Sequence, residues 1–124
     1  MSSGDISNTK AGKRAGETIA GGAIEIVVAN GTSEKTEEVT YNLLLIDLYI
    51  EAPAIVTGVE NKFKIELLTE RDNIIYSSGY LQATEATDYQ VHLQRGLRGI
   101  TKLKITTDGD VNADETFVIE IIGM

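Results

Sequence analysis

The sequence lacks cysteine and tryptophan, and its 124 residues include one proline and one histidine. Without cysteine the chain has no disulfide framework, no thiolate metal site and no cysteine nucleophile. A single histidine excludes a metal site built from several histidines of one chain. No run approaches the ~20 apolar residues of a membrane-spanning helix, so we expect no membrane partner.

Positive charge is also scarce, and the formal net charge is -8. The imbalance is uneven, because residues 1–22 carry a net charge of +1 and residues 23–124 a net charge of -9. An acidic body repels phosphate backbones, so we expect no nucleic-acid partner. A hydrophobic content of 42% is close to that of globular proteins and predicts a folded body.

Two regions of different composition divide the chain. Residues 1–22 are rich in glycine, alanine and serine, which predicts a flexible arm because so little apolar surface is available to offset the entropy of ordering. The alternative is an arm that becomes ordered against a neighbouring subunit. The side chains available for such a contact are Ile6, Lys10, Lys13, Arg14 and Ile19.

Residues 23–124 are predicted to form one all-β domain. Apolar and polar residues alternate, as in Phe63, Ile65 and Leu67, and turn residues recur about every ten positions, which is typical of an antiparallel β-sandwich. Jelly-roll and immunoglobulin-like topologies both fit. The polar segment 32–38 is expected to be a loop. Seven strands are predicted, at residues 23–29, 40–52, 62–69, 74–81, 88–95, 101–107 and 115–122.

The segment 40–52 carries apolar side chains on both faces of its predicted strand. The outer face of a strand in an isolated sandwich is normally polar. A β-bulge, a local turn, coverage by the amino-terminal arm or a subunit interface would each explain the pattern. The candidate interface residues are Leu44, Ile46, Leu48, Ile50, Val118 and Ile122.

The sequence offers no catalytic constellation. His92 is the side chain that titrates nearest neutrality, but the alternation of its strand points it outward with Gln90, as a solvated histidine. No serine lies in a Gly-x-Ser-x-Gly elbow. We therefore expect a protein that is not an enzyme.

The segment from Asp108 to Glu115 has the highest density of oxygen ligands. Asp108, Asp110, Asn112 and Asp114 could together hold Ca²⁺, although Asp, Asn and Gly are also ordinary turn residues. No other cofactor is indicated. The alternative function that this segment supports is a calcium-assisted carbohydrate- or protein-binding module.

The layout as a whole resembles the small all-β accessory proteins of bacteriophage virions, in particular head decoration or cement proteins. The resemblance rests on the arm followed by KFKIELLTERDNIIYSSGYL, DYQVHLQRG, TKLKITTDGD and ETFVIEIIGM. It implies a homo-oligomer, with a trimer favoured, that is made in the host cytoplasm and bound to a capsid or other virion protein. It implies no catalytic residues, and the arm would become ordered on contact with the lattice.

Overall fold

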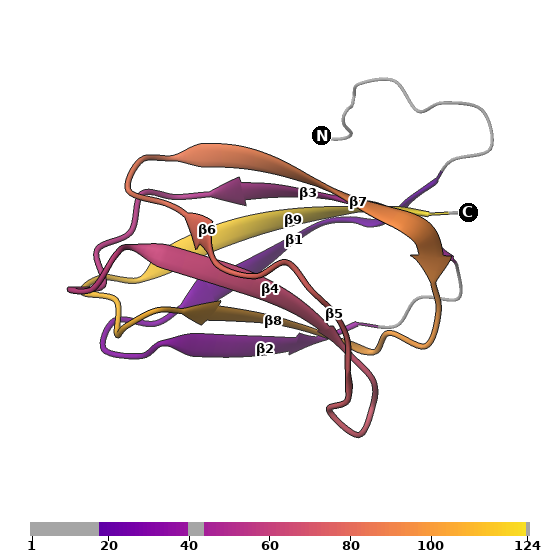
Figure 1. Cartoon of the computed structure of the whole chain (residues 1–124), viewed down its shortest axis with the longest axis horizontal. Helices are drawn as coiled ribbons and strands as arrows, with labels where there is room; N and C mark the ends of the chain where they lie inside the picture. Colours follow the sequence, from indigo (N-terminus) through magenta and orange to yellow (C-terminus); the bar gives the residue numbers. More distant parts are fainter. Residues whose placement is uncertain (1–17, 40–43, 124) are drawn as a thin grey trace.

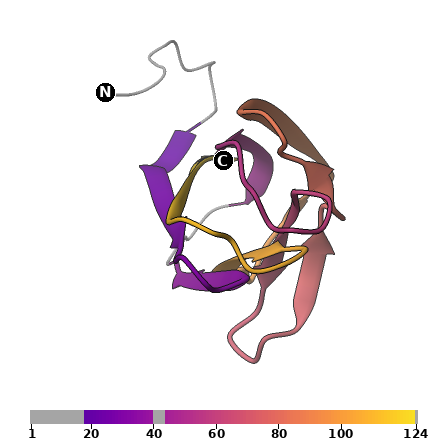
Figure 2. The same ribbon diagram turned by 90° about the vertical axis from the view of Figure 1, so that its left-hand side faces the viewer.

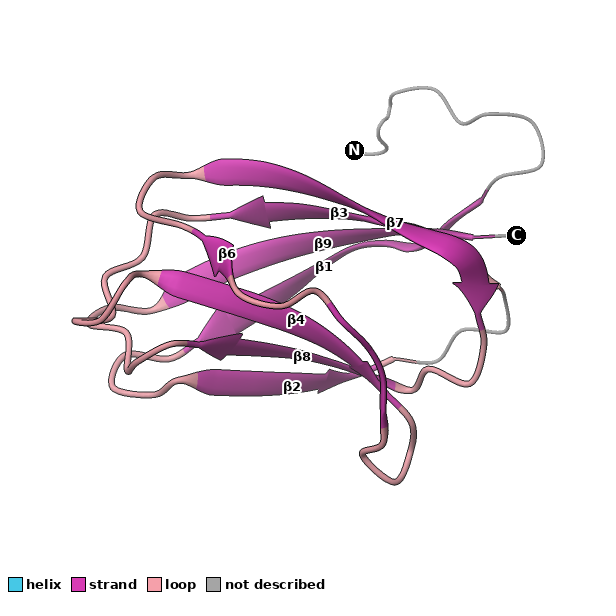
Figure 3. Cartoon of the chain, viewed as in Figure 1, coloured by secondary structure: helices cyan, strands magenta, loops and turns pink. Residues whose placement is uncertain are grey.

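A computed structural model describes residues 18–39 and 44–123 of the chain. These residues form β-strands joined by turns and loops, without a helix (Figure 1, Figure 3), which confirms the all-β prediction. The strands are β1 (Thr18–Val28), β2 (Glu34–Glu38), β3 (Leu45–Ala52), β4 (Lys62–Leu68), β5 (Ile74–Ser77), β6 (Leu81–Gln82), β7 (Thr87–Leu97), β8 (Lys102–Thr107) and β9 (Glu115–Gly123).

The strands form two antiparallel sheets that pack face to face, and Figure 2 views this sandwich end-on. Sheet A has the strand order β1-β9-β3-β7, and sheet B has the order β2-β8-β4-β5, with β6 also paired to β4. The chain changes sheet at nearly every connection; the exceptions are β4 to β5 and β5 to β6. An immunoglobulin-like sandwich pairs consecutive strands such as its first two within one sheet. The observed order is that of a jelly roll, so the sequence prediction of a β-sandwich is confirmed and its topology is resolved.

The core lies between the sheets and uses the inward positions of the alternating strands. Phe63, Ile65 and Leu67 of β4 are completely buried, as predicted. The Phe63 ring joins the two sheets, because its centroid lies 4.9 Å from that of Phe117 in β9 and 5.9 Å from that of Tyr89 in β7. The same alternation predicts inward positions in the strands at 88–95, 101–107 and 115–122, and the residues at these positions that are buried are Val91, Leu93, Leu103, Ile105, Phe117, Ile119 and Ile121.

Strand β2 was not predicted, because its sequence EKTEE is polar and has no apolar alternation. It pairs antiparallel with β8 along its whole length, from Glu34 opposite Thr106 to Glu38 opposite Lys102. The prediction of a loop over 32–38 is therefore wrong. An edge strand needs few apolar side chains when its neighbour supplies a complete set of backbone hydrogen bonds.

A β-bulge explains why β3 is apolar on both of its predicted faces. The register of β3 against both β7 and β9 shifts between Leu45 and Asp47. The extra residue moves Leu48 and Ile50 to the core side, where both are completely buried. Their assignment to a subunit interface is wrong, since neither side chain reaches the surface.

Two element boundaries also differ from the prediction. β1 begins at Thr18, so five residues that were assigned to the arm belong to a strand paired with β9. The segment 74–81, predicted as one strand, pairs antiparallel with β4 but is divided into β5 and β6. The division falls at Gly79, whose φ of 70° lies in the left-handed region and interrupts an extended strand.

Candidate assembly surface

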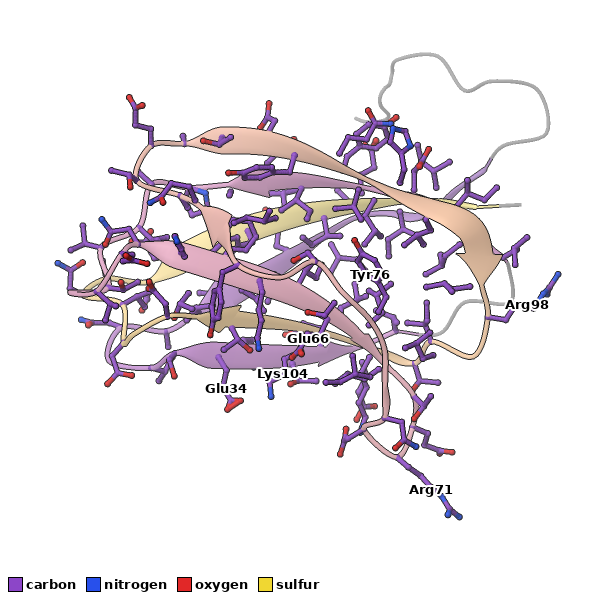
Figure 4. All side chains as sticks on the ribbon, in the orientation of Figure 1. Glu34, Glu66, Arg71, Tyr76, Arg98 and Lys104 are labelled. Carbon is purple, nitrogen blue, oxygen red and sulfur yellow. The ribbon has the colours of Figure 1, made fainter. Side chains whose placement is uncertain are left out.

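The outer face of sheet B carries charges of both signs that pair with one another. Glu66 of β4 lies directly opposite Lys104 of β8, and Glu38 of β2 lies opposite Lys102. Lys104 Nζ also lies 3.1 Å from a carboxylate oxygen of Glu34, and Figure 4 shows Glu34, Lys104 and Glu66 together on this face. Opposite charges on facing strands are stabilising, so this face satisfies its own charges.

Lys64 and Lys102 complete the pattern on sheet B. Lys64 Nζ lies 3.8 Å from a Glu66 carboxylate oxygen and 5.1 Å from the centroid of the Tyr80 ring. Lys102 Nζ lies 2.8 Å from Oδ1 of Asp72, and this hydrogen bond raises the pKa of the Lys102 ammonium. These lysines are therefore held by partners within the same chain.

The outer face of sheet A is acidic. Its four strands contain one basic residue, Arg95 of β7, against several acidic ones. Glu51 of β3 and Asp88 of β7 lie directly opposite each other, and both are exposed. Like charges that face each other across strands are destabilising. The acidic residues at outward positions of these strands are Glu25, Asp47, Glu51, Asp88 and Glu120.

The histidine lies on this acidic face in a defined contact. His92 of β7 is opposite Asp47 of β3, and its Nδ1 lies 2.8 Å from Asp47 Oδ1. The Asp47 side chain is 9% exposed, whereas that of His92 is 69% exposed. An ionised carboxylate only accepts hydrogen bonds, so Nδ1 donates and the Nε2 edge of the ring is left for another contact. The outward position of His92 was predicted, but its partner, 45 residues away, was not, because strand register alone brings the two together.

The predicted calcium ligands serve different neighbours. Asp108 Oδ1 accepts a hydrogen bond of 2.6 Å from the Thr57 hydroxyl, and Oδ2 accepts one of 2.9 Å from the Glu60 backbone amide. Burial acts to raise the pKa of Asp108, but these hydrogen bonds outweigh it and hold the pKa below its ordinary value. Asp114 Oδ1 instead accepts from the Asn30 backbone amide at 2.8 Å.

These two carboxylates tie three loops together at one end of the sandwich. In the part of the chain that the structure describes, no three acidic or histidine side chains form a group suited to a metal ion. Asp110 and Asn112 are exposed in the same loop. Calcium binding by Asp108, Asp110, Asn112 and Asp114 stays a prediction.

The remaining candidate interface residues occupy different environments. Leu44, Ile46 and Val118 are half-buried, and Ile122 is nearly buried at an outward position opposite Asp47. Leu44 packs over Gly96, since a Cβ atom added there would lie 2.3 Å from Leu44 Cγ. Leu44 is thus committed to a contact within its own chain.

Most of the candidate arm residues lie outside the described part of the chain. Ile6, Lys10, Lys13 and Arg14 belong to residues 1–17. Ile19 lies in β1, where its backbone pairs with that of Ile122 in β9. Residues 18–39 and 44–123 include no helix long and apolar enough to cross a membrane.

Comparison with known proteins finds similarity of fold. No protein-family model matches the sequence, and no curated protein sequence matches it. Among solved structures, the chain is similar to a chain of the cyanophage Pam1 capsid asymmetric unit, with a TM-score of 0.58, 11% identity, and coverage of 90% of this chain and 87% of that one. The Drosophila NLP core, whose structure is described for pentamer formation and histone binding, aligns at a TM-score of 0.43 and 12% identity over 83% of this chain and 99% of that one, and supports no argument. At 11% identity, the first similarity identifies a shared jelly-roll sandwich.

Proposed function

We propose that the chain is a non-enzymatic structural protein of a bacteriophage virion, which binds and stabilises an assembled capsid lattice as a decoration or cement protein. The observation that carries this proposal is the likeness to a chain of the cyanophage capsid asymmetric unit, which spans 90% of this chain and 87% of that one. Coverage that is similar on both sides indicates two jelly rolls of comparable size. A small domain that matched part of a much larger shell protein would instead cover only a small share of that protein.

The physical basis of the proposed function is binding linkage. A protein that binds the assembled shell and not its separated subunits stabilises the shell by mass action, by about 2.7 kcal/mol per site when its free concentration is about 100 times Kd. Such a role requires surface complementarity and no reaction chemistry. The two outer faces of the sandwich supply different surfaces, one acidic and one with its charges paired.

The amino-terminal segment is the proposed lattice contact. It carries Lys10, Lys13 and Arg14 on a chain whose remainder is strongly acidic. Opposite charge on the two parts allows the body to stay soluble while the basic segment meets an acidic capsid surface. Together with Ile6 and Ile19 these residues would anchor a homo-oligomer, with a trimer favoured, to the virion.

The test uses purified particles of the phage that encodes this chain. Particles stripped of the protein are mixed with the full chain and sedimented, in parallel with dissociated capsid subunits. We expect the chain to sediment with assembled shells, to bind subunits at least tenfold more weakly, and to raise the temperature at which shells release DNA. Equal binding to shells and subunits, or absence of the chain from particles, would overturn the proposal.

A charge variant separates specific anchoring from general adhesion. Replacing Lys10, Lys13 and Arg14 by glutamine should weaken shell binding while leaving the thermal unfolding of the free chain unchanged. The matched control is the replacement of Lys62, Arg71 and Arg98 by glutamine, which removes the same charge from the body of the domain, where Arg71 and Arg98 are exposed. An equal loss of binding in both variants would show that net charge alone is responsible.

A further inference from the structure

The two edge strands of sheet A are long, and within the described residues neither has a strand partner on its outer side. β1 and β7 each contain 11 residues, and each pairs with a single neighbour within the described residues, β9 and β3 respectively. An edge strand presents a row of backbone N–H and C=O groups that can pair with a strand of another molecule. Among the described residues, sheet A therefore offers a regular row of this kind at residues 23–28 of β1 and at residues 87–92 of β7.

Sheet B protects its edges along their whole length, whereas each edge strand of sheet A has an irregular part and a regular part. The register of β1 against β9 shifts between Ile19 and Ala23, and the register of β7 against β3 shifts between His92 and Leu97. β2 is five residues long, and four of these residues are charged. Lys35 and Glu37 lie directly opposite the buried residues Ile105 and Leu103, so both charged side chains are on the inner face of the sheet. At the other edge, β5 has four residues and β6 has two, with the left-handed Gly79 between them. Short strands, inward charges and interruptions prevent edge-to-edge pairing.

β1 has none of these devices from Ala23 to Val28. This stretch contains one charged residue, Glu25, and no proline, and Val27 is 39% exposed on the outer face. On the inner face of β1, Ile26 and Val28 are buried in the core. An exposed strand of this kind is expected to be covered by a partner.

Strand direction makes a head-to-tail contact between copies antiparallel. Neighbouring strands of sheet A run in opposite directions, and the sheet has four strands, so its two edges also run in opposite directions. When β1 of one copy lies beside β7 of the next, the two strands are antiparallel and continue the pattern of the sheet.

Charge and side-chain direction select the register of this contact. Inward residues must face inward residues, because a shift by one position would move the whole apolar set to solvent. If Ile26 lies opposite Val91, then Glu25 lies opposite His92. A shift that places Glu25 opposite Asp88 would oppose two carboxylates. The former register is favoured because an acidic side chain meets a ring whose Nε2 edge is left open by the Asp47 contact.

We propose that copies of this chain associate head to tail through β1 of one copy and β7 of the next, with Glu25 opposite His92. Such a contact joins two different surfaces, so it forms a ring when the rotation between copies closes and a filament when it does not. The inference concerns self-association and stands without any capsid, so its failure would leave the lattice-binding proposal to its own test.

Cysteine cross-linking tests this contact, because the chain contains no native cysteine. In the variant carrying Glu25→Cys and His92→Cys, the two positions of one chain are separated by three interstrand spacings, roughly 14 Å. A disulfide requires Cα atoms within about 7 Å, so any disulfide must join two copies. We expect a ladder of dimer, trimer and higher species on a non-reducing gel, which collapses to monomer on reduction.

Three controls make the result decisive. Each single-cysteine variant should remain monomeric on the gel, and dimers from Glu25→Cys alone would show β1 pairing with β1 and overturn the proposal. The pair Glu51→Cys with His92→Cys places one cysteine on the central strand β3, and equal cross-linking there would show random collision. Absence of the ladder, with a monomer mass by light scattering for the unmodified chain, would also overturn it. Circular dichroism and thermal unfolding establish that each variant is folded.

Discussion

The two outer faces of this sandwich use charge in opposite ways. On sheet B, Glu66 faces Lys104 and Glu38 faces Lys102, so facing strands attract each other. On sheet A, Glu51 faces Asp88, so facing strands repel each other at this position. The edge strands of the two sheets also differ, since β2 of sheet B is short and charged whereas β1 and β7 of sheet A are long.

This difference indicates that the two sheets contribute differently to the stability of the chain. Sheet B favours the stability of the isolated chain in water, because its facing charges attract each other and its edge strands are short or interrupted. Sheet A retains the repulsion between Glu51 and Asp88, which lowers the stability of the isolated chain. Proteins commonly retain such local destabilisation where a surface has a function. This contrast is the reason for proposing sheet A as the side that meets a partner.

The largest effect is expected from the core that both sheets share. Replacing Phe63 by alanine should lower the free energy of unfolding by about 3–5 kcal/mol, because its completely buried ring contacts both β9 and β7. Denaturant unfolding measures the loss. Val56→Ala is the control, since Val56 is 52% exposed, and a comparable loss in both variants would contradict the assigned core.

A smaller effect is expected where the loops are joined. Asp108→Asn should cost about 1–3 kcal/mol at pH 7, because the bonds from Thr57 and Glu60 lose a charged acceptor. The pKa of Asp108 is lowered in the folded state, so its contribution is complete above the ordinary aspartate pKa of about 3.9 and is lost as the pH falls through the folded value. The difference between wild type and variant should therefore shrink as the pH falls below the ordinary aspartate pKa. A difference that is independent of pH would refute this assignment.

Charge reversal sharpens the comparison of the two faces directly. Glu51→Lys should raise the free energy of unfolding by about 0.2–1 kcal/mol, because the repulsion with Asp88 becomes attraction. The matched change on sheet B, Glu34→Lys, should lower the free energy of unfolding. The substitution replaces an attraction to Lys104, whose Nζ lies 3.1 Å from a Glu34 carboxylate oxygen, with a repulsion. Unfolding at low and high salt measures both, and the two differences should diminish in high salt. Changes of the same sign would contradict the proposed contrast.

The smallest effect is expected from metal removal. We expect chelation to shift the unfolding temperature by less than about 1 °C, since Asp108 and Asp114 already accept hydrogen bonds from the chain and bring no ready-made site for calcium. Thermal unfolding with calcium and with chelator measures this. A rise of several degrees with calcium would revive the binding-module alternative.

The sequence predicted the strands whose apolar residues alternate, and it failed where alternation is absent or interrupted. β2 is held by its pairing with β8, so its own residues EKTEE carry little signal. The bulge in β3 inserts one residue, which moves Leu48 and Ile50 from a predicted interface into the core. For the candidate site, the outward position of His92 could be predicted from period two, but the Asp47 contact could not.

The sequence by itself determined the all-β class, the core positions of β4, β7, β8 and β9, the acidic body and the absence of thiol chemistry. These follow from composition and from the two-residue period of an extended strand, both of which are local properties. Only the tertiary structure decided the jelly-roll order, the contrast between the two outer faces and the identity of the unpaired edges. The physical reason is that strand partners are distant in sequence, so the charge that each side chain faces depends on register and sheet order, which no local pattern encodes.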